Sequence, residues 1–152
     1  LRTVSSPFCK EVKHIVPERL TKEQRSRNMA RVGRRNTAPE LVVRSILHRL
    51  GYRYRLHVTT LPGTPDVVLV RHRKLIQVNG CFWHGHRGCR RAKRPASNRV
   101  FWDQKLTGNI RRDQRNARKL RRLGWSMTVV WECQTKDLKR LEARLIRFMD
   151  RR

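Results

Sequence analysis

Four side chains with affinity for zinc lie in the second half of the sequence. Cys81, His86 and Cys89 form a Cys-x4-His-x2-Cys pattern, and Cys133 ends a later apolar segment. Three thiolates and one imidazole are a donor set that closes a tetrahedral structural zinc site. We therefore expect one Zn2+ that ties the 81–89 loop to the segment before Cys133. The alternative, that small cysteines are core residues, stays open chiefly for Cys133.

A second kind of metal chemistry is indicated by an acid between two apolar segments. Pro65-Asp66 precedes the apolar residues 67–70, and Gln77-Val78-Asn79 ends the next apolar segment. This is the outline of a metal-dependent nuclease hairpin, in which an aspartate and groups of the following strand converge on a divalent ion. Hard oxygen ligands suit Mg2+, which assists phosphodiester hydrolysis. Asp66 is the leading candidate ligand, although an aspartate after a proline also serves as a turn or cap residue.

The elements that must position these residues follow from the spacing of apolar residues. A capping box, Thr37-x-x-Glu40, opens an amphipathic helix that Gly51 ends. The order predicts a single α/β domain with a central mixed β-sheet flanked by helices. The expected elements are helices at 21–33 and 37–50, strands at 52–58, 66–70 and 75–80, a loop at 81–104, a helix at 105–123, a strand at 126–133 and a last helix from Thr135.

Periodicity also predicts which side chains face the core. The strand at 52–58 alternates apolar and basic residues, so its apolar members should point inward. On the helix at 105–123 we expect Leu106, Ile110, Ala117, Leu120 and Leu123 to face inward, and on the last helix Leu138, Leu141, Leu145 and Phe148.

The N-terminal part has little material for a core. Residues 1–20 lack periodicity and are expected to form a basic flexible arm, in which Cys9 is a bystander. A capping box, Thr21-x-x-Gln24, opens a very polar helix at 21–33. We expect residues 21–152 to form the domain proper.

Charge limits the class of partner. The chain has 38 Lys plus Arg against 11 Asp plus Glu, a formal net charge of +27. This excess indicates a polyanionic partner and argues against a purely metabolic role. Its 38% hydrophobic residues suffice for one compact domain. The absence of a long apolar run, and of a secretory signal in residues 1–20, predicts a cytoplasmic protein without a membrane segment.

The loop after the second hairpin strand carries a specific likeness. The segment Gly80-Cys81-Phe82-Trp83-His84-Gly85-His86 resembles the GCFWH segment of the very-short-patch-repair (Vsr) endonucleases, bacterial enzymes that nick next to T:G mismatches. The likeness covers roughly residues 21–150 and implies a restriction-endonuclease-like fold of the PD-(D/E)xK superfamily. It continues in family order through Thr37-Ala38-Pro39-Glu40, residues 61–66, Phe101-Trp102, Lys105, Asn109, Asp113, residues 123–125 and residues 130–133.

The resemblance implies a role for each matching residue of the catalytic site. Asp66 would bind Mg2+ together with the main-chain carbonyl of Val78, in a site for one or two ions. His84 would activate the attacking water, and Glu40 and Asp113 would belong to the surrounding hydrogen-bonded shell. For Glu40 the capping box offers a competing role.

One position departs from the family pattern. Asn79 stands where the family usually has Asp or His before the Gly-Cys-Phe-Trp-His segment. An asparagine cannot carry charge to a metal or shuttle a proton, although it can orient a phosphate or a water. We keep Asn79 among the catalytic candidates, and Gln77 stands where the second acid of the superfamily would be.

Recognition of DNA is expected from aromatic and basic residues. Apolar rings inserted between base steps unstack DNA most easily at a mismatch, and the resemblance assigns Phe82, Trp83 and Trp102 to such a wedge. The alternative is that some of these rings cover the zinc loop. Lys105 and Asn109, one helical turn apart, are expected to contact base edges or phosphate. The 21–33 helix and the arm before it are expected to lie against DNA through Arg25, Arg27, Asn28 and Arg31, and the resemblance implies a clamp on the minor-groove side.

These observations predict a Mg2+-dependent endonuclease that nicks one strand of duplex DNA at a T:G mismatch in a cytosine-methylation context. Two alternatives remain: a zinc-stabilised DNA-binding protein with weakened catalysis, and a Vsr-like nicking or homing endonuclease with another substrate. We expect a monomer associated with the bacterial nucleoid and linked in function to a cytosine-5 DNA methyltransferase and repair machinery.

Overall fold

The computed structural model describes residues 35–151 and, before them, Thr21, Gln24 and Arg27. The backbone N–H of Thr21 donates to Gln24 and the N–H of Gln24 to the Thr21 hydroxyl, so the predicted capping box is present. Arg25, Asn28, Arg31 and the arm at 1–20 lie outside the described residues. Residues 35–152 form a unit of their own.

A four-stranded mixed sheet forms the centre of this unit, as predicted. Its strands are β1 (Arg55–Leu56), β2 (Val67–Leu69), β3 (Lys74–Asn79) and β4 (Ser126–Trp131), in the order β1-β2-β3-β4. The pairs β1/β2 and β2/β3 are antiparallel, as expected for a hairpin, and β3/β4 is parallel. Parallel neighbours need a long crossover connection. Here that connection contains the helix α3 (Arg99–Arg122).

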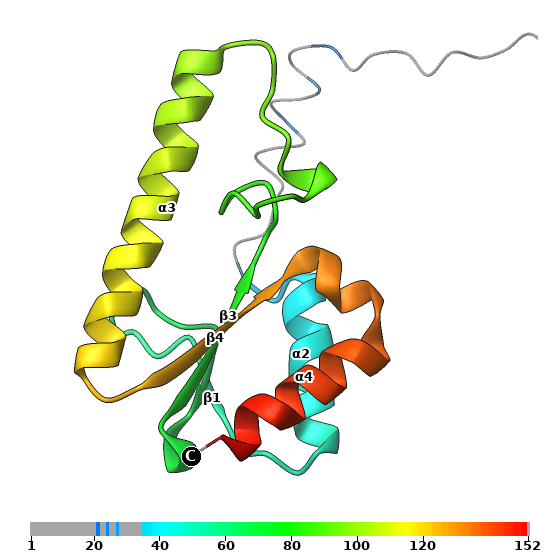
Figure 1. Cartoon of the computed structure of the whole chain (residues 1–152), viewed down its shortest axis with the longest axis vertical. Coiled ribbons are helices and arrows are strands. Elements are labelled where there is room, and N and C mark those ends of the chain that lie inside the picture. Colours follow the sequence, from blue (N-terminus) through cyan, green and yellow to red (C-terminus); the bar gives the residue numbers. More distant parts are fainter. Residues whose placement is uncertain (1–20, 22–23, 25–26, 28–34, 152) are drawn as a thin grey trace, which may run out of the picture. The chain divides into compact units, whose positions relative to one another are not determined.

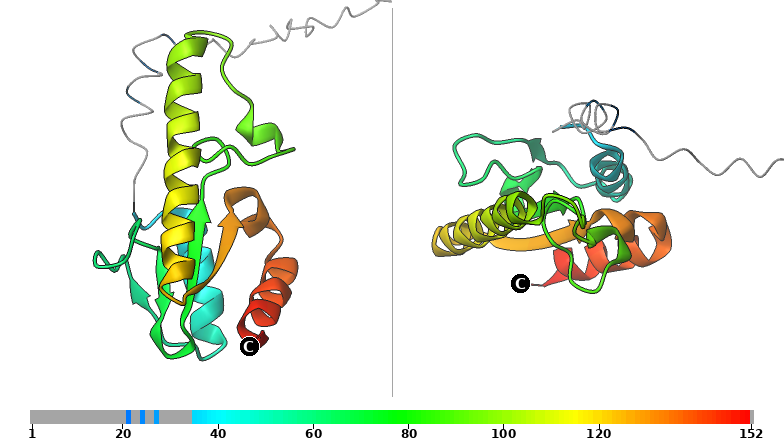
Figure 2. Two further views of the ribbon diagram at one scale, coloured as in Figure 1. Left: turned by 60° about the vertical axis from the view of Figure 1, so that its left-hand side comes forward. Right: turned by 90° about the horizontal axis from the view of Figure 1, so that it is seen from above.

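Helices cover both faces of the sheet (Figure 1). Figure 2 shows α2 (Ala38–Arg49) and α4 (Leu138–Asp150) on one side of the strands and α3 on the other. The sheet residues Val67, Leu69 and Ile76 pack in the cluster that includes α2 and α4, whereas Val68 and Leu75 pack with Leu120 of α3. This alternation explains why β2 is apolar along its whole length and why Leu75 and Ile76 follow one another in β3: both faces of the sheet are buried there.

The expected strand at 52–58 is wrong in extent. Only Arg55 and Leu56 pair with β2, and Leu56, expected inward, is 40% exposed. The backbone enters the left-handed region at His57, with φ of 47°, which ends the strand. Tyr52 and Tyr54 do pack against the core.

The helix α3 begins six residues earlier than expected. Asn98 adopts left-handed φ and ψ at the N-cap position, a conformation that asparagine tolerates. Trp102 therefore lies on the first turn of α3 and not in a loop. Leu106, Ala117 and Leu120 are buried as predicted, Ile110 is half-buried, and Leu123 is exposed, contrary to expectation.

The last helix starts at Leu138 instead of Thr135, because a 3-10 turn (Glu132–Lys136) intervenes and Asp137 caps the helix. Asp137 accepts the backbone N–H of Arg140. Leu138, expected inward, is exposed at this first turn, whereas Leu141 and Leu145 are buried and Phe148 packs partly against the core.

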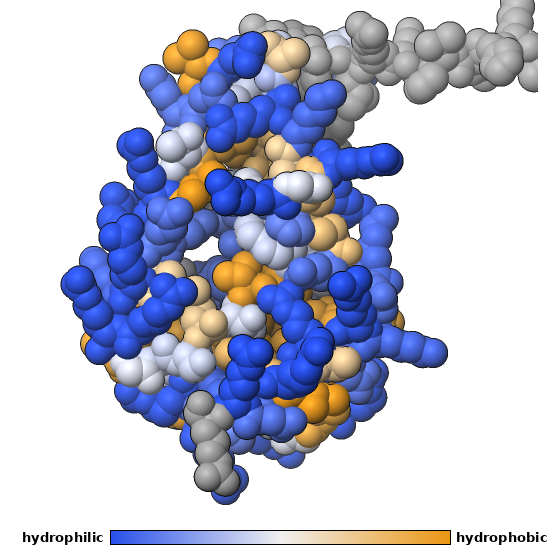
Figure 3. Space-filling view, in the orientation of Figure 1, coloured by the Kyte–Doolittle hydropathy of each residue, from blue (hydrophilic) through white to orange (hydrophobic). Residues whose placement is uncertain are grey.

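The surface reflects the composition. Figure 3 shows a face covered mainly by hydrophilic side chains, with apolar residues in small separate areas. Within the ranges that the structure describes, no helix is both long enough and apolar enough to cross a membrane.

Candidate functional site

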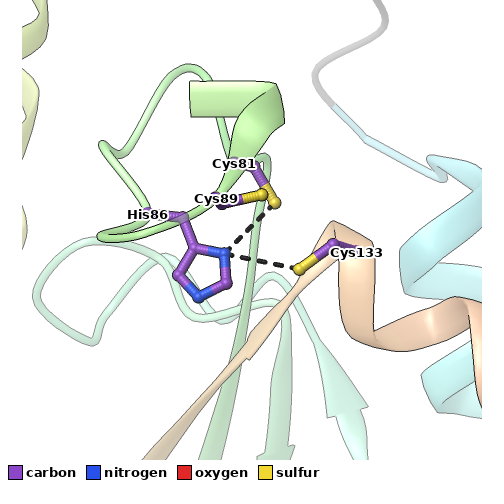
Figure 4. Close-up of side chains that lie close together, drawn as sticks. All are labelled: Cys81, His86, Cys89 and Cys133. Carbon is purple, nitrogen blue, oxygen red and sulfur yellow. Dashed lines mark hydrogen bonds between the residues drawn. The ribbon is translucent and has the colours of Figure 1, made fainter. Parts of the chain in front are cut away.

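The four predicted zinc ligands converge. The donor atoms of Cys81, His86, Cys89 and Cys133 all lie within 4.8 Å of one another. His86 directs Nδ1 at the sulfurs, 3.5 Å from Cys81 and 3.4 Å from Cys133 (Figure 4). In a tetrahedral site with ordinary zinc bond lengths, sulfur and nitrogen are roughly 3.5 Å apart. These two nitrogen–sulfur distances are therefore those expected around a tetrahedral zinc ion.

The surroundings of these thiols differ. Burial raises the pKa of Cys81 to about 12. The backbone N–H of Arg91 lowers the pKa of Cys89 below its ordinary value, because it stabilises the thiolate. Trp131 stacks on the His86 ring, with ring centroids 4.3 Å apart and planes 7° apart, so it packs directly against this cluster.

Asp66 lies directly before β2 and is 8% exposed. One carboxylate oxygen, Oδ2, accepts the backbone N–H of Val78 at 2.7 Å and the amide of Gln77 at 2.9 Å. The Val78 N–H is free to make this bond because β2 begins at Val67, opposite Ile76, while β3 continues to Asn79. Burial raises the pKa of Asp66, and the Val78 N–H opposes this effect. The N–H and C=O of one strand residue point to the same side, so the Val78 carbonyl shares this edge with Asp66.

Glu40 is buried beside Asp66 and serves two purposes at once. Its Oε1 accepts the backbone N–H of Thr37 at 3.4 Å, as the predicted capping box requires, and also the Thr37 hydroxyl at 2.8 Å. Its Oε2 accepts from Arg44 Nη2 at 2.6 Å in an ion pair that is almost fully buried. The helix start thus fixes the carboxylate that the resemblance assigned to the catalytic shell.

His57 completes this group, although the sequence pattern did not indicate it. Its Nδ1 lies 3.9 Å from Asp66 Oδ1 and its Nε2 lies 3.7 Å from Glu40 Oε2. The donor atoms of Glu40, His57 and Asp66 lie within 4.8 Å of one another. In the sequence His57 falls among the alternating basic residues 53–57, which a strand pattern predicts to be solvated. The left-handed turn at His57 instead brings the side chain to Asp66, and no local signal predicts that turn.

His84 and Asp113 form a second pair. His84 Nδ1 is 2.5 Å from Asp113 Oδ2, and both side chains are partly exposed. The turn that carries His84 approaches α3 so closely at Gly85 that a Cβ there would lie 2.7 Å from Ile110. A side chain at position 85 would displace the end of Ile110, and the φ of 64° also favours glycine here.

A cavity of about 560 Å³ lies between the sheet and α3. Gln77, Asn79, His84 and Asp113 are among its lining residues. Asn79 is 5% exposed, and its Oδ1 is a buried oxygen without a hydrogen-bond partner. Gln77 lines the cavity and also bonds Asp66, so it connects the two groups of candidate catalytic residues.

The three predicted wedge residues form one aromatic cluster. Phe82 meets Trp83 and Trp102 edge to face, with ring centroids 5.1 and 5.4 Å apart. Phe101, which the sequence analysis left out of this set, packs edge to face on Trp102 and is 47% exposed. Aromatic rings that meet at a half-exposed surface suit stacking on bases as well as covering the zinc loop.

Lys105 and Asn109 contact the same aromatic cluster. Lys105 Nζ lies 5.4 to 5.7 Å from the ring centroids of Phe101, Trp83 and Trp102. Asn109 donates to the Trp83 carbonyl at 3.1 Å. Both predicted DNA-binding residues of α3 thus lie where the wedge residues are held.

Comparison with known proteins gives consistent likenesses. Residues 18–91 match the family described as DNA mismatch endonuclease Vsr. The type II nicking enzyme V.XorIIP of Xanthomonas oryzae pv. oryzae is 48% identical over 133 residues, which cover 88% of this chain and 97% of that protein. DNA mismatch endonuclease Vsr of Escherichia coli is 39% identical over 120 residues, covering 79% and 76%. The type II nicking enzyme V.NmeAIP of Neisseria meningitidis is 37% identical over 129 residues, covering 85% and 91%.

Proposed function

The chain belongs to the Vsr family of DNA mismatch endonucleases, and we propose that it nicks one strand of duplex DNA at a T:G mismatch by Mg2+-dependent hydrolysis. The observation that carries this proposal is the pairing of His84 with Asp113 on a cavity that Gln77 connects to the buried carboxylate of Asp66. A base and a metal-binding acid are the two groups that phosphodiester hydrolysis requires.

His84 is the general base in this proposal. Asp113 holds Nδ1, so the other ring nitrogen, Nε2, is left to accept the proton of the attacking water. The water oxygen forms the new bond to phosphorus. The bond from phosphorus to the leaving oxygen breaks, and that oxygen keeps the electron pair and takes a proton from solvent.

Asp66 and the Val78 carbonyl would hold Mg2+. Two observations support this fit. Among the described residues, Asp66 Oδ1 accepts no hydrogen bond, and His57 Nδ1 lies 3.9 Å from it. Burial of the charged carboxylate also costs free energy, which a bound cation would offset. When bound, the ion neutralises charge on the scissile phosphate and makes water more acidic. Asn79 Oδ1 then has a role as an acceptor for water or for a donor on the substrate, which its lack of a partner supports.

Recognition is assigned to the aromatic cluster and to the basic residues. Phe82, Trp83 and Trp102 would enter the stack at the mismatch, where unstacking costs least. Lys105 and Asn109 would contact bases or phosphate nearby. The zinc ion would stiffen the loop from which Phe82, Trp83 and His84 project.

A related activity is favoured by the names of two relatives. V.XorIIP and V.NmeAIP are named type II nicking enzymes, which supports a second candidate, a nicking enzyme that acts in another sequence context. Such an enzyme would use the same catalytic residues, and only the flanking bases would differ.

Nicking of a labelled duplex with one T:G mismatch tests the proposal. We expect Mg2+-dependent cleavage of the T strand, absent in EDTA, absent on the matched duplex and abolished by Asp66→Ala. The mismatch is placed in several cytosine-methylation contexts, so that cleavage in only one of them identifies the flanking bases. Tight binding without a nick in any context, with Mg2+ or Mn2+, would refute the catalytic proposal.

A further inference from the structure

The side chain of His57 lies between Arg44 and Asp66, and the proposed reaction gives His57 no role. It is partly buried, with a side-chain exposure of 15%, and Arg44 Nη2 lies 3.1 Å from its Nε2. Arg44 is itself fixed, because its guanidinium also donates to Glu40 and, at 2.7 Å, to Asn36 Oδ1. The ring therefore has one nitrogen against an arginine and the other toward Asp66.

The contact with the arginine selects one tautomer of the ring. A guanidinium offers only donors, so His57 Nε2 has to be the acceptor in the contact with Arg44. A neutral imidazole accepts at one nitrogen and carries its proton on the other. His57 is accordingly the tautomer with N–H at Nδ1, the nitrogen that lies 3.9 Å from Asp66 Oδ1.

The carboxylate of Asp66 has a free acceptor position for the His57 N–H. An ionised carboxylate has about four acceptor positions, two on each oxygen. Val78 and Gln77 occupy both positions on Oδ2. One position on Oδ1 suits the His57 N–H, which leaves one position for a cation. The present separation of 3.9 Å is somewhat longer than a hydrogen bond, as is common for site contacts before ligands bind.

We propose that His57 is a positioning residue for Asp66: held by Arg44, it donates from Nδ1 to Oδ1 and fixes the orientation in which Asp66 binds its divalent ion. This inference rests on the proposed role of Asp66 and deepens it. His57 is not a metal ligand in this arrangement, because its only lone pair in the ring plane accepts from Arg44. Its effect is on the affinity of the site for hard cations of every kind.

Two substitutions distinguish the contributions of the two ring nitrogens to metal binding. The amide of His57→Asn overlays the Nδ1 side and keeps a donor toward Asp66, and asparagine tolerates the φ of 47° at this position. The amide of His57→Gln overlays the Nε2 side and keeps an acceptor for Arg44 but removes the donor. Binding of Mn2+ and of Ca2+ is measured by calorimetry on the zinc-loaded protein, with a melting curve for each variant to show that it is folded.

We expect His57→Asn to bind both ions within about threefold of the parent, and His57→Gln to bind both about 10-fold more weakly. Equal affinity of His57→Gln and the parent would overturn the proposal. A loss for Mn2+ with unchanged Ca2+ would also overturn it, since nitrogen ligation matters more for Mn2+ than for the oxygen-preferring Ca2+.

The tautomer is tested without any variant. In protein labelled with 15N at histidine, His57 should show a protonated Nδ1 and a bare Nε2, and Mg2+ should leave the Nδ1 proton in place. A proton on Nε2, or loss of the Nδ1 proton when Mg2+ binds, contradicts the proposal whatever the variants do.

The same experiments distinguish this inference from the proposed function. Asp66→Asn should abolish Mn2+ and Ca2+ binding in the parent background. If it does, and His57→Gln has no effect, the positioning role fails and the metal site stands. If Asp66→Asn leaves the binding of both ions unchanged, the metal site of the proposed function fails, and the positioning role of His57 fails with it.

Discussion

At the scale of single residues, the candidate site divides its chemistry between two hydrogen-bonded groups. Asp66 is oriented by main-chain and amide donors of β3, and His84 is oriented by a carboxylate of α3. Each functional side chain thus has a partner from a different element. Substitutions of the partners should affect rate or affinity without removing the functional group itself.

Asp113→Asn should lower the rate of strand cleavage about 100-fold or more, because the amide can present an N–H to His84 Nδ1 and favour the wrong tautomer. The variant keeps the size of the side chain, so duplex binding should stay within about threefold of the parent. Single-turnover nicking and a binding titration in Ca2+ give the two values. A variant that cleaves at the parental rate would exclude Asp113 from orienting the base.

Asp66→Asn should stabilise the protein in EDTA. Burial raises the pKa of Asp66 above the ordinary value of 3.8, so between 3.8 and the raised pKa the folded state binds more protons than the unfolded state. Stability therefore falls as the pH rises through this window, and at neutral pH the charged group costs free energy. We expect the asparagine variant to gain on the order of 1 kcal/mol at pH 7.

Melting curves across pH test this sign. The gain in Tm over the parent should shrink as the pH falls through the raised pKa of Asp66, because the parent then becomes neutral at this position. Asp103→Asn, at a carboxylate that is about half exposed, is the matched control and should leave Tm nearly unchanged. A variant at position 66 that melts below the parent at pH 7 in EDTA would contradict the assigned burial cost.

At the scale of elements, the sequence predicted well where apolar periodicity was strong. The helix from Ala38, the hairpin and the strand from Ser126 follow the pattern because both faces of β2 and β3 are buried. The pattern failed where single backbone conformations decided the structure. The left-handed conformation of His57 ends β1 before the expected position. The left-handed conformation of Asn98 starts α3 six residues before the expected position. Tertiary contacts select such conformations, which is why His57 was not foreseen.

The candidate site shows the same division. The zinc ligands were predicted from residue type and spacing, and they do converge. Asp66 was indicated by its place before an apolar strand, whereas Glu40, His84 and Asp113 came from a likeness to a family. The structure places Glu40 beside Asp66 and His84 beside Asp113. The stacking of Trp131 on His86 depends on the parallel pairing of β3 and β4, which no local pattern in the sequence indicates.

Cys133→Ser should release zinc and loosen the loop at 81–89. Loss of an ion present at 100 times its Kd removes about 2.7 kcal/mol of stability. Because Trp131 stacks on His86, the fluorescence of Trp131 should change when loss of zinc frees the His86 ring. Metal analysis and Tm are compared with Cys9→Ser, a cysteine outside the proposed ligand set. One equivalent of zinc retained by the Cys133 variant would exclude Cys133 as a ligand.

At the scale of the whole molecule, the net charge of +27 requires that DNA binding depend steeply on salt. Contacts to phosphate release counter-ions whatever the base sequence. Added salt should therefore lower the affinity for matched and for mismatched duplexes by the same factor. Discrimination between them has to come from contacts to bases and from the cost of unstacking. The ratio of the two affinities, measured at several salt concentrations, is therefore the quantity that reports on the aromatic cluster.

Deletion of residues 1–33 tests whether this segment makes specific contacts to DNA or contributes only non-specific electrostatic attraction. Eight cations and three carboxylates in this segment account for five of the 27 formal positive charges. If charge alone mattered, most of the affinity and of the salt slope would remain. We expect instead a loss of duplex affinity of about 100-fold or more with a modest decrease in slope, because specific contacts to sugar and phosphate position a protein on DNA. Titration of a fluorescent T:G duplex measures both, and parental affinity in the deleted chain would refute the clamp.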